Sequence, residues 1–253
     1  HGARYGDDLS DPFLVDTALD IFAGQRPERA YYQVDDVLDT SMSVALVLDE
    51  SSSMLDTVQM GGRRTQLIKV ATRIMIAIVE PLDRLGIPVQ ATGFRNGKYR
   101  NVQRNPAEKG RHHRHEGHVT DVFKLFEERF DAVKWRFANT RGMGGTPMAD
   151  GMQFGLDSLN FRPEGHRVMF VVTDGCPSGG QDVIKWQLRT AKEAGILVIG
   201  VGLGEPAKYV KTLFPDYVWS RNFGDFPTLL LDKLNTLIDL TASKRGQRMA
   251  SRV

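Results

Sequence analysis

Three short apolar runs constrain the fold of this chain more than any other feature of its sequence. Each run is rich in β-branched residues, shows no alternation of apolar and polar positions, and is too short for a helix. Such runs are typical of strands buried on both faces, as in a parallel sheet covered by helices on each side. The three runs are Val44–Leu48, Val168–Val172 and Ile196–Val201, and a weaker fourth is Val89–Phe94.

Helix-like segments separate these runs. Pro147 suits the first position of a helix, and Gly195 suits the position that ends one. Apolar residues lie almost all round the segment 65–85, which predicts a central, buried helix. Strands that alternate with helices predict an α/β fold, with a doubly wound, mostly parallel sheet flanked by helices. The expected helices span residues 65–85, 121–130, 147–159, 181–194 and 226–240.

Charge is distributed unevenly, although the formal net charge is only +2. Residues 1–56 are rich in Asp and Glu, whereas residues 95–118 are rich in Lys, Arg and His. We expect a polar, acidic lead-in over residues 1–40 and one α/β domain over residues 41–243, which carries a basic, His-rich insertion at about 95–118. Residues 244–253 form a basic tail. This asymmetry indicates electrostatically steered partners.

Hydroxyl and carboxylate side chains stand where the strands are expected to end. Asp49 follows the first run, with Ser51 and Ser53 two and four residues later, and Asp174 comes after the second run. Ligand groups in open parallel sheets gather beyond the carboxyl ends of the strands, so both aspartates are expected at the same level. Thr146 adds a third hydroxyl after a glycine-rich stretch. Such a set of hard oxygen atoms suits Mg²⁺ or Mn²⁺.

The pattern resembles the metal-ion-dependent adhesion site of von Willebrand factor A (VWA) domains. Asp-x-Ser-x-Ser at residues 49–53, a distant threonine and an Asp-Gly after a buried strand carry the resemblance, which covers about residues 41–242. It implies that Ser51, Ser53 and Thr146 contact the metal ion. It also implies that Asp49 and Asp174 bind the ion directly or through water, and that a partner's carboxylate completes the shell.

Within that family, three stretches are most similar to the CobT-type subunit of aerobic cobaltochelatase and to related bacterial proteins that work with AAA+ ATPases. The resemblance implies a Mg²⁺-dependent module, without enzymatic activity of its own, that docks an Asp or Glu of a AAA+ ATPase subunit. Such a module would be a non-ATPase subunit or adaptor in a metal-insertion assembly of cobalamin biosynthesis. Ser52 stands where the family usually has glycine, which removes no ligand. The three stretches are VALVLDESSSM, PVQATGF and VMFVVTDGCPSGG.

Other functions fit parts of the sequence. A VWA protein of the Ro type would bind RNA through the basic stretch 95–118, with a steep dependence on salt. A metal-dependent phosphohydrolase would use the same strand ends, but the first loop lacks the second aspartate of an Asp-x-Asp motif. In a purely structural interpretation the same residues are helix N-caps, since Asp and Ser are favoured at helix N-termini. The site could also keep its geometry and bind no metal.

Two further features allow more than one interpretation. The stretch 111–118 carries four histidines among basic residues, which fits a solvated loop, a transition-metal or porphyrin site, or an anion-binding or RNA-phosphate patch. We favour the solvated loop. Cys176 follows Asp174 closely, and we expect a small buried residue in a turn rather than a reactive thiol.

Several classes of protein lack support in this sequence. It contains no P-loop, no nucleophile elbow and no H-E-x-x-H motif, so we expect no ATP hydrolysis by the chain itself. No apolar run approaches the roughly 20 residues of a membrane span, and the start shows no apolar core of a signal peptide. We therefore expect a cytoplasmic protein that makes no membrane contact.

Overall fold

A six-stranded sheet forms the centre of the computed structural model, which describes residues 8–9, 31–32, 41–60, 63–96, 118–178, 180–226, 228–233 and 236. The strand order is β10-β9-β8-β3-β6-β7. Every neighbouring pair is parallel except β6 and β7. The strands are β3 (Met42–Asp49), β6 (Val89–Asn96), β7 (His118–Lys124), β8 (His166–Thr173), β9 (Ile196–Leu203) and β10 (Asp216–Ser220).

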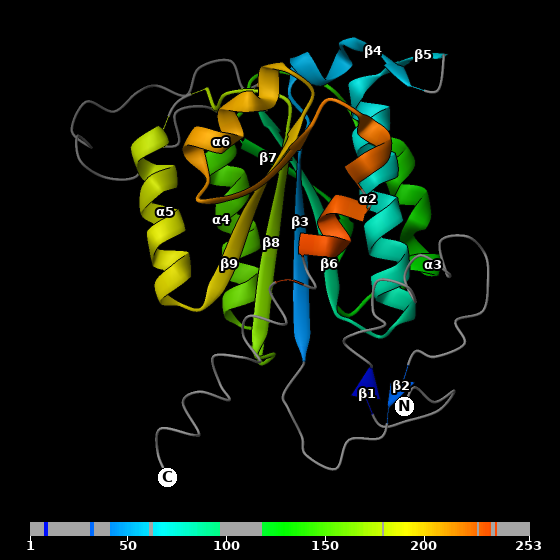
Figure 1. The fold of residues 1–253 in the computed structure, drawn as a ribbon, viewed down its shortest axis with the longest axis vertical. Coiled ribbons are helices and arrows are strands. Elements are labelled where there is room, and N and C mark those ends of the chain that lie inside the picture. Colours follow the sequence, from blue (N-terminus) through cyan, green and yellow to red (C-terminus); the bar gives the residue numbers. More distant parts are fainter. Residues whose placement is uncertain are drawn as a thin grey trace.

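Helices cover both faces of this sheet, as Figure 1 shows. One face packs against α2 and α3, and the other packs against α4, α5 and α6. All eight residues of β3 are buried, because the strand lies in the middle of the sheet between the two layers. The α-helices are α2 (Leu67–Arg84), α3 (Phe130–Val133), α4 (Met148–Asn160), α5 (Gln181–Glu193) and α6 (Val210–Leu213).

Short elements complete the described part of the chain. Residues 228–233 are also helical, within the segment expected to form the last helix. Two small antiparallel sheets join β1 (Asp8–Leu9) to β2 (Tyr31–Tyr32) and β4 (Thr57–Met60) to β5 (Arg63–Gln66). The 3-10 helices are η2 (Ser52–Leu55), η4 (Lys134–Asn139), η5 (Pro206–Tyr209) and η6 (Phe223–Asp225).

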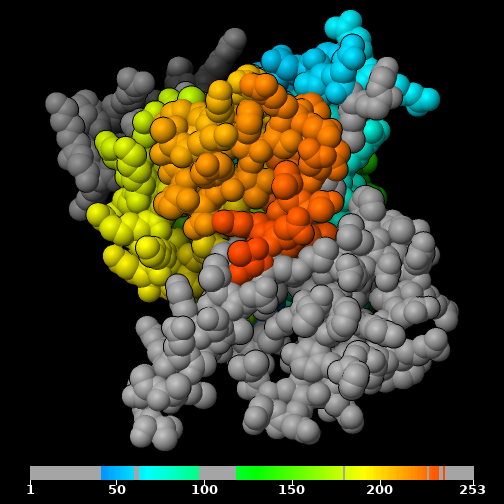
Figure 2. All heavy atoms as spheres, viewed as in Figure 1, coloured from blue at the N-terminus to red at the C-terminus, as the bar shows by residue number. Residues whose placement is uncertain are grey.

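This architecture is the α/β fold with a doubly wound, mostly parallel sheet that the apolar runs predict. Each of the four runs lies within a strand, and α2, α4 and α5 fall within two residues of their expected bounds. The helix α2 buries most of its length, as the distribution of apolar residues around it indicates. Its start differs, because residues 63–66 pair with β4 in a hairpin instead of joining the helix. That hairpin projects from one edge of the molecule (Figure 2).

The helix expected over residues 121–130 is wrong. Residues 118–124 form β7, which pairs antiparallel with β6 from His118 opposite Asn96 to Lys124 opposite Ala91. The buried amine of Lys124 lies 3.1 Å from the carboxylate of Asp83 and donates a hydrogen bond to the carbonyl of Val89. Local apolar spacing cannot detect such pairing with a distant strand, and tertiary contacts here outweigh it.

The remaining expectations about the ends of the chain fall mostly outside the described residues. The basic tail 244–253 and residues 97–117 of the insertion lie there, as does most of the acidic lead-in. The division into lead-in, domain, insertion and tail therefore stays a prediction. In the part of the chain that the structure describes, no helix is long and apolar enough to cross a membrane.

The close approach of α4 to the sheet yields a test of this packing. A Cβ atom on Gly151 would lie 2.4 Å from Cγ of the buried Phe94. We expect Gly151→Ala to lower the free energy of unfolding by about 1–3 kcal/mol because the helix must move off the ring. Gly155→Ala is the comparison variant and should cost less, since its Cβ would lie 2.9 Å from Sδ of the flexible Met169 side chain and 3.0 Å from Cγ2 of Val47. Urea denaturation measures both variants, and a stabilised Gly151→Ala protein would contradict this packing.

Candidate metal centre

The candidate site lies where the order of strands reverses. From β3 the chain continues to β6 and β7 on one side, and later returns to β8 on the other side of β3. Leu48 of β3 is in register with Val172 of β8, so Asp49 and Asp174 leave neighbouring strands at nearly the same level. Crevices at such reversal points are where open α/β sheets hold ligands.

Hydrogen bonds join four of the five predicted ligands into one cluster. The hydroxyl of Ser53 donates to Oδ1 of Asp174 at 2.9 Å. The hydroxyl oxygens of Ser51 and Ser53 lie 3.0 Å apart and share a hydrogen bond. The backbone N–H of Ser51 donates to Oδ1 of Asp49 at 2.8 Å. The tight loop after β3 therefore directs its oxygen atoms at the end of β8, which its sequence spacing alone could only suggest.

The fifth predicted ligand, Thr146, lies in a loop that hydrogen bonds join to the turn after β8 and to the loop after β3. Its N–H donates to the hydroxyl of Ser178 at 2.7 Å, and the N–H of Ser178 donates back to its carbonyl at 3.0 Å. On the other side, the N–H of Ser52 donates to the carbonyl of Gly144 at 2.9 Å. Gly144 has a φ of 71°, in the left-handed region that favours glycine. The glycine-rich stretch thus lets this loop bend against the loop after β3.

Ser52 begins the 3-10 helix η2, whose backbone conformation a serine adopts without strain. It lies exposed in η2, and its N–H is used in the bond to Gly144. A glycine is therefore not required at this position of the chain.

Burial dominates the electrostatics of the two aspartates. Asp49 is 0% and Asp174 is 5% exposed. Burial raises the pKa of Asp49 to about 6, although hydrogen bonds from Thr173 and Ser51 oppose the rise. Burial also raises the pKa of Asp174, with the Ser53 hydroxyl opposing it. Among the described residues, no Lys, Arg or His forms an ion pair with either carboxylate, so their negative charge lacks a protein partner there.

A divalent cation would match this donor set. Carboxylate and hydroxyl oxygens are hard ligands of the kind that Mg²⁺ and Mn²⁺ take, and a cation offsets the buried negative charge. Within the described ranges, no three His, Cys, Asp or Glu side chains come together as a metal site. The cluster at the ends of β3 and β8 differs in kind, because it combines two carboxylates with hydroxyl groups.

Sequence reasoning missed three residues that support the cluster. The hydroxyl of Thr173 donates to Oδ2 of Asp49 at 2.7 Å from a fully buried position. Ser178 holds the loop of Thr146, as described above. The signal for Thr173 was its place directly before Asp174 at the end of an apolar strand, where a buried hydroxyl needs a partner.

Glu50 is the third of these residues, and it joins the loop after β3 to the loop of Thr146. Its Oε1 accepts a hydrogen bond from the N–H of Arg141 at 2.8 Å, and its carbonyl accepts one from Met143 at 2.7 Å. Burial raises the pKa of its carboxyl to about 8, and the nearby Asp121 carboxylate adds to the rise. Gly93 makes room for it, since a Cβ there would lie 2.3 Å from Oε2.

Other predictions about this region have mixed outcomes. Cys176 is exposed, so the expectation of a buried residue is wrong; the turn after β8 directs it outward. Residues 111–117 of the His-rich stretch lie outside the described residues. At its ends, Arg95 forms an ion pair with Asp121 at 3.0 Å, and Nε2 of His118 is hydrogen-bonded to Thr120.

The reversed sheet order and the strand-end cluster are features expected of a VWA domain, and comparison with known families shows that the chain is one. The family model described as "Cobalamin biosynthesis protein CobT VWA domain" matches residues 31–212. The chain belongs to this family, and it is thus a VWA module related to cobalamin biosynthesis. No curated protein matches the chain.

Solved structures share the fold at low sequence identity. The PilB minor pilin from Streptococcus sanguinis is 15% identical with a TM-score of 0.56, over 84% of this chain and 66% of its own. The pilus adhesin SpaC from Lactobacillus rhamnosus GG is 15% identical with a TM-score of 0.54, over 78% and 30%. Proximal thread matrix protein 1 from the mussel byssus is 15% identical with a TM-score of 0.50, over 80% and 47%. This chain thus spans less than two thirds of each of them, and the likeness concerns the fold alone.

The raised pKa of Asp49 predicts how stability changes with pH in the absence of metal. Its carboxyl titrates at about 6 in the folded protein and at its ordinary 3.8 in the unfolded chain, so the folded state binds more protons between these values. We expect the free energy of unfolding in EDTA to fall as pH rises from about 4 to above 6, by about 3 kcal/mol from this group. Urea denaturation at several pH values measures the slope. Asp49→Asn cannot titrate and should lack this component; an unchanged slope would contradict the assignment.

The role of Glu50 as a link between loops predicts different effects of two substitutions. At pH 7 its carboxyl is protonated, so Glu50→Gln keeps a neutral group that can accept from the Arg141 N–H. We expect Glu50→Gln to change the free energy of unfolding by less than about 1 kcal/mol. Glu50→Ala leaves that N–H without its acceptor and opens a cavity, which costs about 2–4 kcal/mol. Chemical denaturation at pH 7 compares the two variants. Equal losses of stability would contradict the assignment of the Arg141–Glu50 hydrogen bond as the stabilising link between the loops.

Proposed function

We propose that this VWA module binds Mg²⁺, or Mn²⁺, through Asp49, Ser51, Ser53, Thr146 and Asp174, and that the bound ion docks a carboxylate of a partner protein. One observation carries the proposal. Two buried carboxylates without a described basic partner lie hydrogen-bonded to hydroxyl groups at the reversal point of the sheet. Burying a carboxylate costs free energy, and a bound cation would offset that cost at both aspartates.

The residues divide between holding the ion and shaping the site. Ser51, Ser53 and Thr146 would supply hydroxyl oxygen atoms to the ion. Asp49 already accepts hydrogen bonds on both carboxylate oxygens, from Ser51 and Thr173, which suits binding through water. Asp174 would lie opposite with its oxygen now bonded to Ser53.

Only two of the five candidate metal ligands are charged, and such a ligand set leaves the bound ion able to attract a further anion. The ion would carry two positive charges against two aspartates, so an added carboxylate is not repelled by an excess of negative ligands. When bound, the metal ion supplies an open coordination position for that carboxylate. The chain contributes a rigid arrangement, since three loops are joined by hydrogen bonds before any ion binds.

The family gives this docking its context. A VWA module related to cobalamin biosynthesis suits a non-ATPase subunit or adaptor of a cobaltochelatase-like assembly. We propose that the carboxylate belongs to an Asp or Glu of a AAA+ ATPase subunit, whose nucleotide-driven motion acts on a larger reaction through this contact. The chain itself would carry out no chemistry.

Binding of Mg²⁺ is the first test. We expect isothermal titration calorimetry to detect binding of Mg²⁺ to the wild-type protein, and to detect none for Asp174→Ala. Thr146→Ala should weaken binding by at least about tenfold. Cys176→Ser is the matched control, because the thiol is exposed two residues from Asp174 and is not a ligand. Binding of equal strength to Asp174→Ala would refute the metal site.

Partner binding is the second test. We expect the AAA+ ATPase subunits of the same genome to bind the wild-type protein in Mg²⁺ and not in EDTA, and to lose binding with Asp49→Ala or Asp174→Ala. Circular dichroism should show that both variants stay folded. If these variants bind the partner as well as the wild-type protein does, docking through the metal ion is contradicted. Tight binding of RNA at low salt, lost steeply as salt rises, would favour the RNA-binding alternative instead.

A further inference from the structure

We propose that the cavity beside the candidate metal centre is a second docking site for the same partner, and that it takes an acidic segment with apolar side chains. This inference rests on the proposed function. It adds to that function by stating what the partner must carry next to its metal-binding carboxylate.

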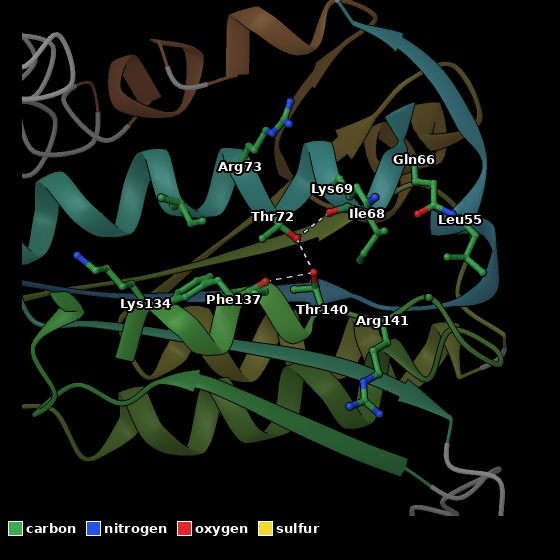
Figure 3. A pocket seen from close by; sticks show the side chains of 13 residues that line it. Leu55, Gln66, Ile68, Lys69, Thr72, Arg73, Lys134, Phe137, Thr140 and Arg141 are labelled. Carbon is green, nitrogen blue, oxygen red and sulfur yellow. Dashed lines mark hydrogen bonds between the residues drawn. The ribbon is translucent and has the colours of Figure 1, made fainter. Parts of the chain in front are cut away.

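The cavity lies between α2, η4 and the loop that follows η4, and has a volume of about 630 Å³. Pockets of this size hold a few side chains of a bound segment. Figure 3 shows the residues that line it. Ile68 and Phe137 are buried in its floor. The ring of Phe137 stacks on Phe123 at 5.3 Å, so the floor is part of the core and is rigid.

The polar groups of the floor already have partners. The hydroxyl of Thr72 lies 2.7 Å from the carbonyl of Ile68 and 3.0 Å from the hydroxyl of Thr140, and its single proton serves one of these two acceptors. The hydroxyl of Thr140 donates to the carbonyl of Phe137 at 3.3 Å. The floor therefore offers an apolar surface rather than free hydrogen-bond donors.

The rim of the cavity is cationic. Four of the 13 lining residues are Lys or Arg, and none is Asp or Glu. Within the described residues, Lys69, Arg73 and Arg141 have no ion-pair partner, whereas Lys134 pairs with Asp131 at 3.0 Å on the surface. An exposed pair of this kind is weak and can exchange its partner. A ligand with several negative charges fits this rim.

The directions of these side chains favour a segment over a small anion. The guanidinium groups of Arg73 and Arg141 point outward from the cavity in opposite directions, and Lys134 lies at one end of it (Figure 3). A phosphate or sulfate ion needs donors that converge within hydrogen-bond distance. Cations spread around an apolar floor instead suit acidic side chains that alternate with apolar ones along a peptide.

The cavity lies next to the loop after β3, which carries Ser51 and Ser53 of the candidate metal centre. Leu55 and Gly142 line it, and Leu55 ends η2, which begins directly after Ser51. A Cβ atom on Gly142 would lie 2.5 Å from Cγ of Leu55 and 3.2 Å from the carbonyl of Ser51. Leu55 thus lies between the candidate ion position near Ser51 and Ser53 and the cavity, in the path of a segment that occupies both. Leu55 is 42% exposed and is available to that segment.

A selection experiment tests the chemistry of the segment without knowledge of the partner. Random 12-residue peptides displayed on phage are selected on the full chain in Mg²⁺. We expect the enriched peptides to carry an Asp or Glu followed within a few residues by apolar residues and further acids. Enrichment of basic or uncharged peptides would overturn the proposal, as would the absence of any enrichment over empty beads.

Charge reversal then assigns the binding to the cavity. The affinity of an enriched, fluorescently labelled peptide is measured by anisotropy for wild type and for Lys69→Glu combined with Arg73→Glu. Both residues are exposed on α2. We expect about a tenfold loss of affinity that shrinks as salt rises. The matched control is Lys185→Glu combined with Arg189→Glu, two exposed cations of α5 on the opposite face, which should leave affinity unchanged. Equal losses for both pairs would overturn the proposal.

The same assay separates this proposal from the proposed function. Loss of affinity in EDTA and in Asp174→Ala reports the metal centre, and loss in the α2 variant reports the cavity. Peptides that need Mg²⁺ but bind the α2 variant like wild type would refute the cavity and leave the metal site standing. Peptides that bind equally in EDTA but need Lys69 and Arg73 would refute docking of the carboxylate through the metal ion and leave the cavity standing.

Two other occupants are outcomes that overturn the proposal. Displacement of the peptide by micromolar pyrophosphate would assign the cavity to a small anion. A wild-type dimer in sedimentation velocity that dissociates in the α2 variant would assign it to a second copy of this chain.

Discussion

The carboxylate of Asp49, fully buried at the end of the central strand β3, is the constraint on which the rest of the site depends. Burying a charge costs free energy unless hydrogen bonds and an opposite charge offset it. The fold supplies the hydrogen bonds from Ser51 and Thr173, one from the same loop and one from the neighbouring strand. It does not supply a positive charge among the described residues, and this shortfall is the physical basis for placing a cation here. The second carboxylate, Asp174, reaches the same point because β8 lies next to β3.

The three loops around this carboxylate behave as one unit. Glu50 connects the loop after β3 to the glycine-rich loop, and Ser178 connects the glycine-rich loop to the turn after β8. Gly142 packs against Leu55, so the same contacts that shape the candidate metal centre also form one wall of the cationic cavity. A partner bound in the way we propose would meet a preformed surface that favours anionic groups. Preformed surfaces lose less conformational entropy on binding, which favours affinity.

Much of this arrangement could be predicted from short sequence patterns, and the failures have physical causes. Apolar runs without alternation identified the buried strands, because only a strand covered on both faces can bury every side chain. The spacing of apolar residues over 121–130 instead predicts a helix and is wrong there, since β7 is an edge strand whose pairing with β6 involves residues far along the chain. Strand β10, also at an edge, has too few apolar residues for a continuous run and was not expected. Cys176 lies in a turn whose direction depends on neighbouring loops, and its exposure could not be read from its own chemistry.

The sequence by itself determined the class of fold and the identity of the oxygen-bearing residues at the strand ends, because apolar periodicity and residue type are local properties of the chain. Only the tertiary structure decided which of these residues meet. The strand order places β8 beside β3, and this brings Ser53 within 2.9 Å of an aspartate 121 residues away. It also decided that Thr173, Ser178 and Glu50 support the site, and that cations from α2 and η4 surround a cavity next to it. Such contacts depend on how distant segments pack against each other, and no local pattern encodes their distances.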